Sequence, residues 1–292
     1  MSKRYLNTLI SESLEIEAIE AKEAGAIGYM ARILTQATMP HKKVLGNEFI
    51  RSNGLFSLSI VAPSRIGLPY GTIPRLLLAW LTTESVKTKS NVVVLGHTLS
   101  GFMRELGLIP AGGRWGTITR LREQMQRLFS SAISYTYDKG AHWSIKNIQP
   151  VTQADLWWDP KIPEQASLWQ STVTLSQEFF TEITSRPIPI DFRALKTLKR
   201  SPLAIDIYCW LTYRMSYLKR NTSIPWDVLQ LQFGSNYMQP EHGKRDFKRA
   251  FLRELKKVLV VYDRLNLDFD SKLLILKPSK PHISRNITTD YL

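Results

Sequence analysis

Apolar positions recur along this chain with two periods, and each period predicts one kind of secondary structure. A spacing of three to four residues predicts amphipathic helices, whereas alternation or a short apolar run predicts strands. The helical period predicts helices at 8–36, 73–86, 98–106, 115–131, 177–184, 191–198, 202–218, from Pro225 onward, and at 244–259. Gly25 and Gly28 weaken the first of these, so a kinked or two-part helix is expected there. Strands are predicted at 48–51, 55–61, 92–95, 133–137, 143–148, 171–175, 222–224, 260–265 and 272–276.

These elements follow the same order twice: helix, short strand, helix, turn, longer helix and hairpin. The tripeptides Trp80-Leu81-Thr82 and Trp210-Leu211-Thr212 occupy equivalent places in the two series. This is the order of a winged helix, in which the last helix enters the major groove of DNA and the hairpin lies beside it. The sequence therefore predicts an α+β protein with two tandem winged-helix domains. The expected divisions are an acidic N-terminal helical segment at 1–47, a first winged helix at 48–162, a second at 163–285 and a tail at 286–292.

The charge of the chain favours a polyanionic partner. The 292 residues carry 39 Lys and Arg against 25 Asp and Glu, a net charge of +14. Five of the acids lie in the first 23 residues, so the predicted winged helices are more basic than the total suggests. Double-stranded DNA is the partner that this charge and fold predict. No apolar run reaches the length of a membrane span, and no secretory signal is evident, so a cytoplasmic protein without a membrane partner is expected.

The predicted helix at 115–131 has an apolar stripe formed by Ile118, Leu121, Met125, Leu128 and Phe129. Its remaining positions mix charged and amide side chains. Arg can donate two hydrogen bonds to guanine, Gln can pair with adenine, and a helix start favours phosphate. The helix is therefore predicted to read base sequence. Its candidate DNA contacts are Arg114, Thr117, Thr119, Arg120, Glu123, Gln124 and Arg127.

The predicted helix at 244–259 is more one-sided in charge. Seven bases and two acids lie between Lys244 and Lys257. Such a density of positive charge predicts contacts with the phosphate backbone and a strong dependence of affinity on salt. The candidate contacts are Lys244, Arg245, Lys248, Arg249, Arg253, Lys256 and Lys257.

The sequence provides no recognisable catalytic chemistry. There is no phosphate-binding loop, and the five histidines are scattered rather than paired as a metal site for DNA nicking would require. Cys209 lies in an apolar run and is expected in the core, and the carboxylates of Asp263, Asp268 and Asp270 are expected on a solvated wing. No catalytic residue, metal or cofactor is assigned, and the protein is not expected to be an enzyme. The tryptophans at 143, 157, 158 and 169 are expected to pack between the domains.

Several stretches resemble a known family, the plasmid-encoded replication initiators called RepA. They are Leu76–Lys89, Ser100–Phe129, Leu229–Gly234, Arg245–Tyr262 and Leu276-Lys277-Pro278-Ser279, and the resemblance spans roughly residues 45 to 285. It implies binding to repeated sites in a plasmid origin, opening of adjacent duplex and recruitment of the host's replication initiator and replicative helicase. Relatives of this class also dimerise and repress their own gene, so a homodimer is a further hypothesis.

The sequence is also compatible with two other functions. A transcriptional repressor or architectural protein with the same two domains would bind an operator without initiating replication. A nicking initiator of rolling-circle replication is the third alternative, and the absence of a histidine pair argues against it.

Overall fold

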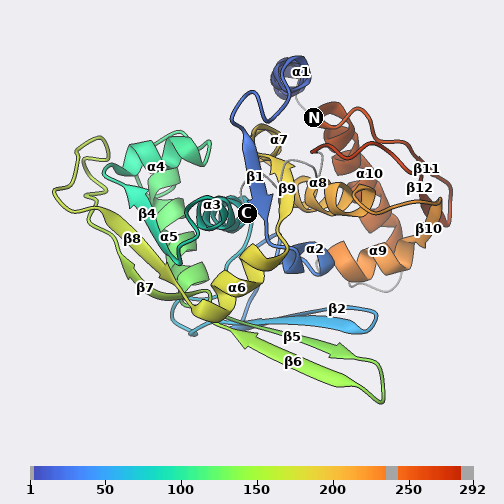
Figure 1. Ribbon diagram of the computed structural model, residues 1–292, viewed down its shortest axis with the longest axis horizontal. Helices are drawn as coiled ribbons and strands as arrows, with labels where there is room; N and C mark the ends of the chain where they lie inside the picture. Colours follow the sequence, from blue (N-terminus) through green and yellow to red (C-terminus); the bar gives the residue numbers. More distant parts are fainter. Residues whose placement is uncertain (1–2, 235–242, 284–292) are drawn as a thin grey trace.

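The two predicted winged helices are present, and both contain the same order of elements (Figure 1). The structure is a computed structural model that describes residues 3–234 and 243–283. The first winged helix comprises α3 (Thr72–Thr88), β4 (Val92–Gly96), α4 (Leu99–Glu105), α5 (Thr117–Phe129), β7 (Val151–Asp155) and β8 (Ser171–Leu175). The second comprises α8 (Pro202–Met215), β10 (Thr222–Pro225), α9 (Trp226–Phe233), α10 (Gly243–Val261), β11 (Leu267–Phe269) and β12 (Leu273–Leu276). In each, the strand after the first helix pairs with the last strand, in the orders β4-β8-β7 and β10-β12-β11.

The wing of the first domain is not the hairpin that the sequence predicted. That hairpin forms, as β5 (Ala132–Asp138) and β6 (Trp143–Ile148), but β5 pairs with β3 (Phe56–Val61) in a four-stranded sheet of order β2-β3-β5-β6, whose edge strand β2 is Glu48–Asn53. The partner of β4 is β8, so the wing is β7–β8 and the Trp-rich segment at 156–170 is its loop. Strand β8 lies beyond residue 162, where the second domain was expected to begin. Local patterns predict strands but carry no information about which distant strands pair.

The N-terminal segment is also built differently from the expected helix at 8–36. Helix α1 (Lys3–Ala18) ends early, and strand β1 (Ile27–Met30) precedes a short helix α2 (Ile33–Gln36). Strand β1 pairs antiparallel with β9 (Ile188–Asp191), which lies between α6 (Gln177–Ser185) and α7 (Phe192–Thr197). A Cβ on Gly28 would lie 2.6 Å from the ring of Phe192, so glycine permits this close approach.

Helix α10 continues where a strand was predicted at 260–265. The helix ends at Val261, and the next strand begins only at Leu267. Val258 and Val261 are buried on the same face as Leu255, which extends the helical stripe of the core. The valine-rich run at 258–261 suggested a strand, but packing outweighs the weak intrinsic preference of valine for strands. The tail predicted at 286–292 lies outside the described residues.

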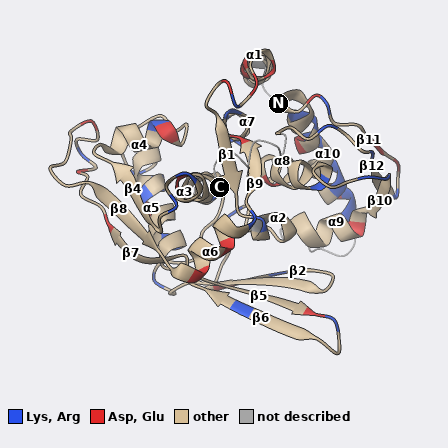
Figure 2. Ribbon diagram, in the orientation of Figure 1, with Lys and Arg blue, Asp and Glu red and all other residues tan. Residues whose placement is uncertain are grey.

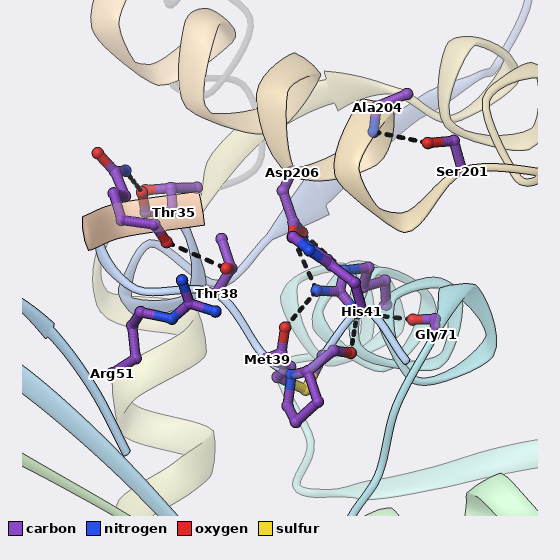
Figure 3. A network of polar contacts seen from close by, with 12 residues as sticks. Thr35, Thr38, Met39, His41, Arg51, Gly71, Ser201, Ala204 and Asp206 are labelled. Carbon is purple, nitrogen blue, oxygen red and sulfur yellow. Dashed lines mark hydrogen bonds and ion pairs between the residues drawn. The ribbon is translucent and has the colours of Figure 1, made fainter. Parts of the chain in front are cut away.

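The two winged helices meet at a buried polar network between α3 and α8 (Figure 3). The Arg75 guanidinium donates from Nε and Nη2 to the two carboxylate oxygens of Asp206, each at 2.7 Å, and His41 Nε2 lies 2.7 Å from Asp206 Oδ2. Arg75 also donates to the backbone carbonyls of Met39, Pro40 and Gly71. Both charged side chains are therefore buried with their hydrogen bonds satisfied, as burial of a charge requires.

No helix in the described part of the chain combines the length and apolar character needed to span a bilayer.

Candidate nucleic-acid interface

The turn that leads into α5 is held by hydroxyl groups and by one glycine. The Thr98 side chain caps α4 by accepting from the Gly101 amide, as predicted. Thr117 Oγ1 donates to the Ile109 carbonyl and accepts from the Ala111 amide at 2.9 Å. A Cβ on Gly116 would lie within 2.3 Å of two carbonyl oxygens, so this position requires glycine. The Thr117 hydroxyl therefore shapes the helix-turn-helix and is already occupied.

The outward face of α5 carries some of the predicted contacts and two that the sequence analysis missed. Arg114 and Arg120 are exposed, and the Arg114 guanidinium lies over the exposed ring of Trp115. Arg122 and Gln126 are also exposed. They follow Thr119 by three and seven residues, the spacing of one helical face, and this signal was available in the sequence.

Three other candidates on α5 are engaged within the protein. Gln124 is 4% exposed, and its side-chain oxygen accepts from the Tyr70 amide at 2.9 Å. Arg127 is 9% exposed and donates to the Leu68 carbonyl and to Glu123. These side chains fix the loop before α3 against α5. Gln124 and Arg127 position the helix and do not face solvent in this structure, whereas the Glu123 side chain is 42% exposed beside its partner Arg127.

Four predicted bases of α10 project along one exposed stripe. Arg245, Arg249 and Lys256 are separated by four and seven residues, so they share one face, and Arg253 lies beside them. All four are exposed, and Figure 2 shows this helix carrying several basic segments. Arg249 contacts Asp246 and Arg253 contacts Glu254, each at 2.9 Å. The Arg249–Asp246 contact is exposed on both sides and can exchange for phosphate, whereas Arg253 contacts a buried carboxylate.

The remaining bases of α10 have structural partners. Lys248 Nζ donates to the backbone carbonyl of Asp270 at 2.7 Å, at the tip of the second wing, and lies over the Trp226 ring. Lys257 pairs with Glu254 and lies over the ring of Tyr5 in α1. Lys244, at the start of the helix, lies 3.5 Å from the exposed carboxylate of Asp227.

Glu254 is the buried acid of this helix. Burial raises its pKa, but hydrogen bonds from Lys257, Ser201 and Arg253 more than offset this and hold the pKa below its ordinary value. The carboxylate is therefore ionised at neutral pH, and Lys257 is needed to balance its buried charge.

The first wing differs from the second in chemistry. Trp158 stacks on Phe102 with ring centroids 5.3 Å apart, so this tryptophan packs as the sequence predicted. Trp157 and Trp169 in the same loop are exposed, and so is Trp143 at the tip of the β5–β6 hairpin, so the packing expected of these three is wrong. The first wing is thus aromatic and the second carries the acidic tip formed by Asp268 and Asp270.

In the residues that the structure describes, no three His, Cys, Asp or Glu side chains gather into a group that could hold a metal ion. The described residues form two winged helices, each presenting basic side chains from its longer helix.

Comparison with solved structures supports this fold. Crystal structures of domains 2 and 3 of RctB superpose with TM-scores of 0.54 and 0.51, cover 85% and 88% of this chain and 96% and 98% of their own, and share 13% identity with it. At this identity the likeness concerns the fold. No curated protein matches the sequence.

The family of plasmid-encoded RepA proteins matches residues 68–228, which is more than half of the chain and includes all of the first winged helix. This confirms the resemblance found in the sequence: the chain belongs to the RepA family of plasmid replication initiators.

Proposed function

We propose that this protein initiates plasmid replication by binding double-stranded DNA at repeated origin sites through α5 and α10. The observation that carries this proposal is the pair of exposed basic helices, one in each winged helix of a RepA-family chain. Two recognition helices on one chain can occupy successive major grooves. Bound initiators then promote opening of the adjacent duplex and recruit the host initiator and replicative helicase.

The two helices have different roles in this proposal. Helix α5 and the turn before it read bases through Arg120 and Arg114, while Arg122 and Gln126 are exposed on the helix face that they share with Thr119. Helix α10 grips phosphates through the stripe of Arg245, Arg249 and Lys256. Phosphate contacts fix register and supply affinity, whereas base contacts supply specificity.

A transformation test separates an initiator from a repressor. A plasmid that carries this gene and its flanking DNA as its only origin should replicate in a suitable host, and the same plasmid with Arg249→Ala and Lys256→Ala should not. A protein that binds its flanking DNA but never supports replication would be a transcriptional repressor or architectural protein instead.

Host recruitment and dimerisation need their own measurements. We expect purified host helicase to be retained on origin DNA only when this protein is present. A homodimer in solution would appear at twice the 33.5 kDa chain mass in light scattering. The same binding at its own promoter would repress its gene, which a promoter-reporter fusion would detect.

A further inference from the structure

A cavity of about 910 Å³ lies between the two winged helices, away from the exposed faces of α5 and α10. The C-terminal ends of α3, α6 and α8 line it, together with residues of β1 and β9. Pockets of this size hold single small molecules, and a duplex does not fit into one. Both winged helices contribute to the wall, so a molecule bound here contacts both.

The lining is basic. Arg32, Lys89 and Arg186 line the cavity, and none of the described residues that line it is acidic. Helices α3, α6 and α8 end here, and each helix end contributes about half a negative charge. The three positive charges exceed the total charge of the three helix ends by about 1.5, and Glu182, which interacts electrostatically with Arg32, offsets part of this excess. The helix ends explain part of the basic lining, and the excess favours an anion.

The lining is also aromatic and contains an unsatisfied polar group. Tyr213 and Tyr217 meet edge to face with ring centroids 5.0 Å apart, and Phe180 lies on another wall. Ser85 is fully buried, and among the described residues its hydroxyl has no hydrogen-bond partner. Buried polar groups are normally satisfied, so an unpartnered hydroxyl in a cavity wall is consistent with a ligand that supplies the missing partner.

We propose that this cavity binds a nucleoside phosphate. Such a ligand carries the negative charge that Arg32, Lys89 and Arg186 complement. Its base provides a flat ring to stack on the tyrosines, as bases do on aromatic side chains, and polar atoms for hydroxyl and carbonyl groups. The proposal is independent of the DNA-binding function, because it uses none of the residues assigned to α5 or α10.

Lys89 allows a clean test. Its φ of 54° is in the left-handed region, which a lysine adopts at a cost and glycine adopts freely. Lys89→Gly therefore removes one cavity charge without threatening the fold. Arg186→Gln removes a second positive charge of the cavity, from an exposed position. Tyr217→Leu removes an exposed aromatic ring. The matched control is Lys87→Ala with Lys42→Ala, which removes two exposed charges that do not line the cavity.

Calorimetric titration of the full chain with ATP should show one bound molecule. We expect Lys89→Gly with Arg186→Gln, and separately Tyr217→Leu, to weaken ATP binding by about tenfold or more. The control pair should bind ATP as the wild type does, and all these variants should bind duplex DNA normally.

Three results would overturn the proposal. The first is no ATP binding by the wild type. The second is binding of inorganic triphosphate as tight as that of ATP, which would leave the aromatic wall without a role. The third is loss of ATP binding in Arg249→Ala with Lys256→Ala, together with its displacement by duplex DNA, which would place the nucleotide on α10.

Discussion

The basic stripe of α10 should determine much of how the affinity for DNA depends on salt concentration. Replacing Arg245, Arg249 and Lys256 by Ala removes three exposed charges and leaves the helix intact, because Ala is the best helix former. The stripe extends for about 16 Å along the helix axis, at 1.5 Å per residue, which is enough for three separate phosphates. Each lost phosphate contact reduces the slope of log affinity against log salt by about 0.9, so the triple variant should lose about 2.7 of slope.

The difference is large enough to measure by fluorescence anisotropy with labelled duplex. Between 50 and 200 mM salt, the wild type should lose about 40-fold more affinity than the triple variant. Origin DNA and random duplex should be affected alike, since phosphates carry no sequence information directly. A control variant with the same change in net charge replaces three exposed bases outside α5 and α10: Lys42, Lys43 and Lys87.

An unchanged slope in the α10 variant would refute the assignment of this stripe to phosphates. An equal loss of slope in the control would show that overall charge, and not the stripe, governs binding. Lys257→Ala is unsuitable for this experiment, because it would uncover the buried charge of Glu254 and confuse stability with affinity.

Three further predictions concern the domain junction and the specificity of α5. Asp206→Asn should lower the free energy of unfolding by about 3–5 kcal/mol in urea denaturation, since it leaves buried Arg75 without its charge partner, whereas Asp227→Asn at an exposed site should change it by less than about 0.5 kcal/mol. Burial lowers the pKa of His41 below its ordinary value, so the folded state resists protonation. Stability should therefore be full above a pH of about 6.5 and fall as the pH drops below it, and His41→Gln should reduce this slope; an unaltered slope would exclude His41 as a source. Arg120→Ala should relax the preference for one base pair by about 1–3 kcal/mol in competition binding, and an equal loss on random duplex would argue for a phosphate contact instead.

The sequence predicted which elements form better than how they assemble. Periodicity located both series of helices, because amphipathic stripes such as that of α5 are local patterns. The pairing of β4 with β8, which the β5–β6 hairpin separates along the chain, depends on contacts distant in sequence. Strand β1 was missed because Gly25 and Gly28 suggested a kinked helix, whereas in the fold Gly28 allows close packing on Phe192.

For the candidate interface, the sequence identified the correct helices but not every exposed side chain. Gln124 was counted as a DNA contact because it is polar, yet it follows Leu121 by three residues and precedes Leu128 by four, which places it beside the core stripe. Arg122 and Gln126 were overlooked although their spacing from Thr119 places them outward. Spacing predicts exposure here better than polarity does.

The buried pair of Arg75 and Asp206 constrains the exchange of either winged helix of this chain for the corresponding domain of a relative. Each winged helix supplies one charge of this pair, and the opposite charge comes from the other domain. A chimera that joins one domain to the counterpart from a relative would retain a compensated junction only if the relative carries the complementary side chain. Recombination between initiators of different plasmids should therefore succeed most often when both members of this pair are inherited in matching form.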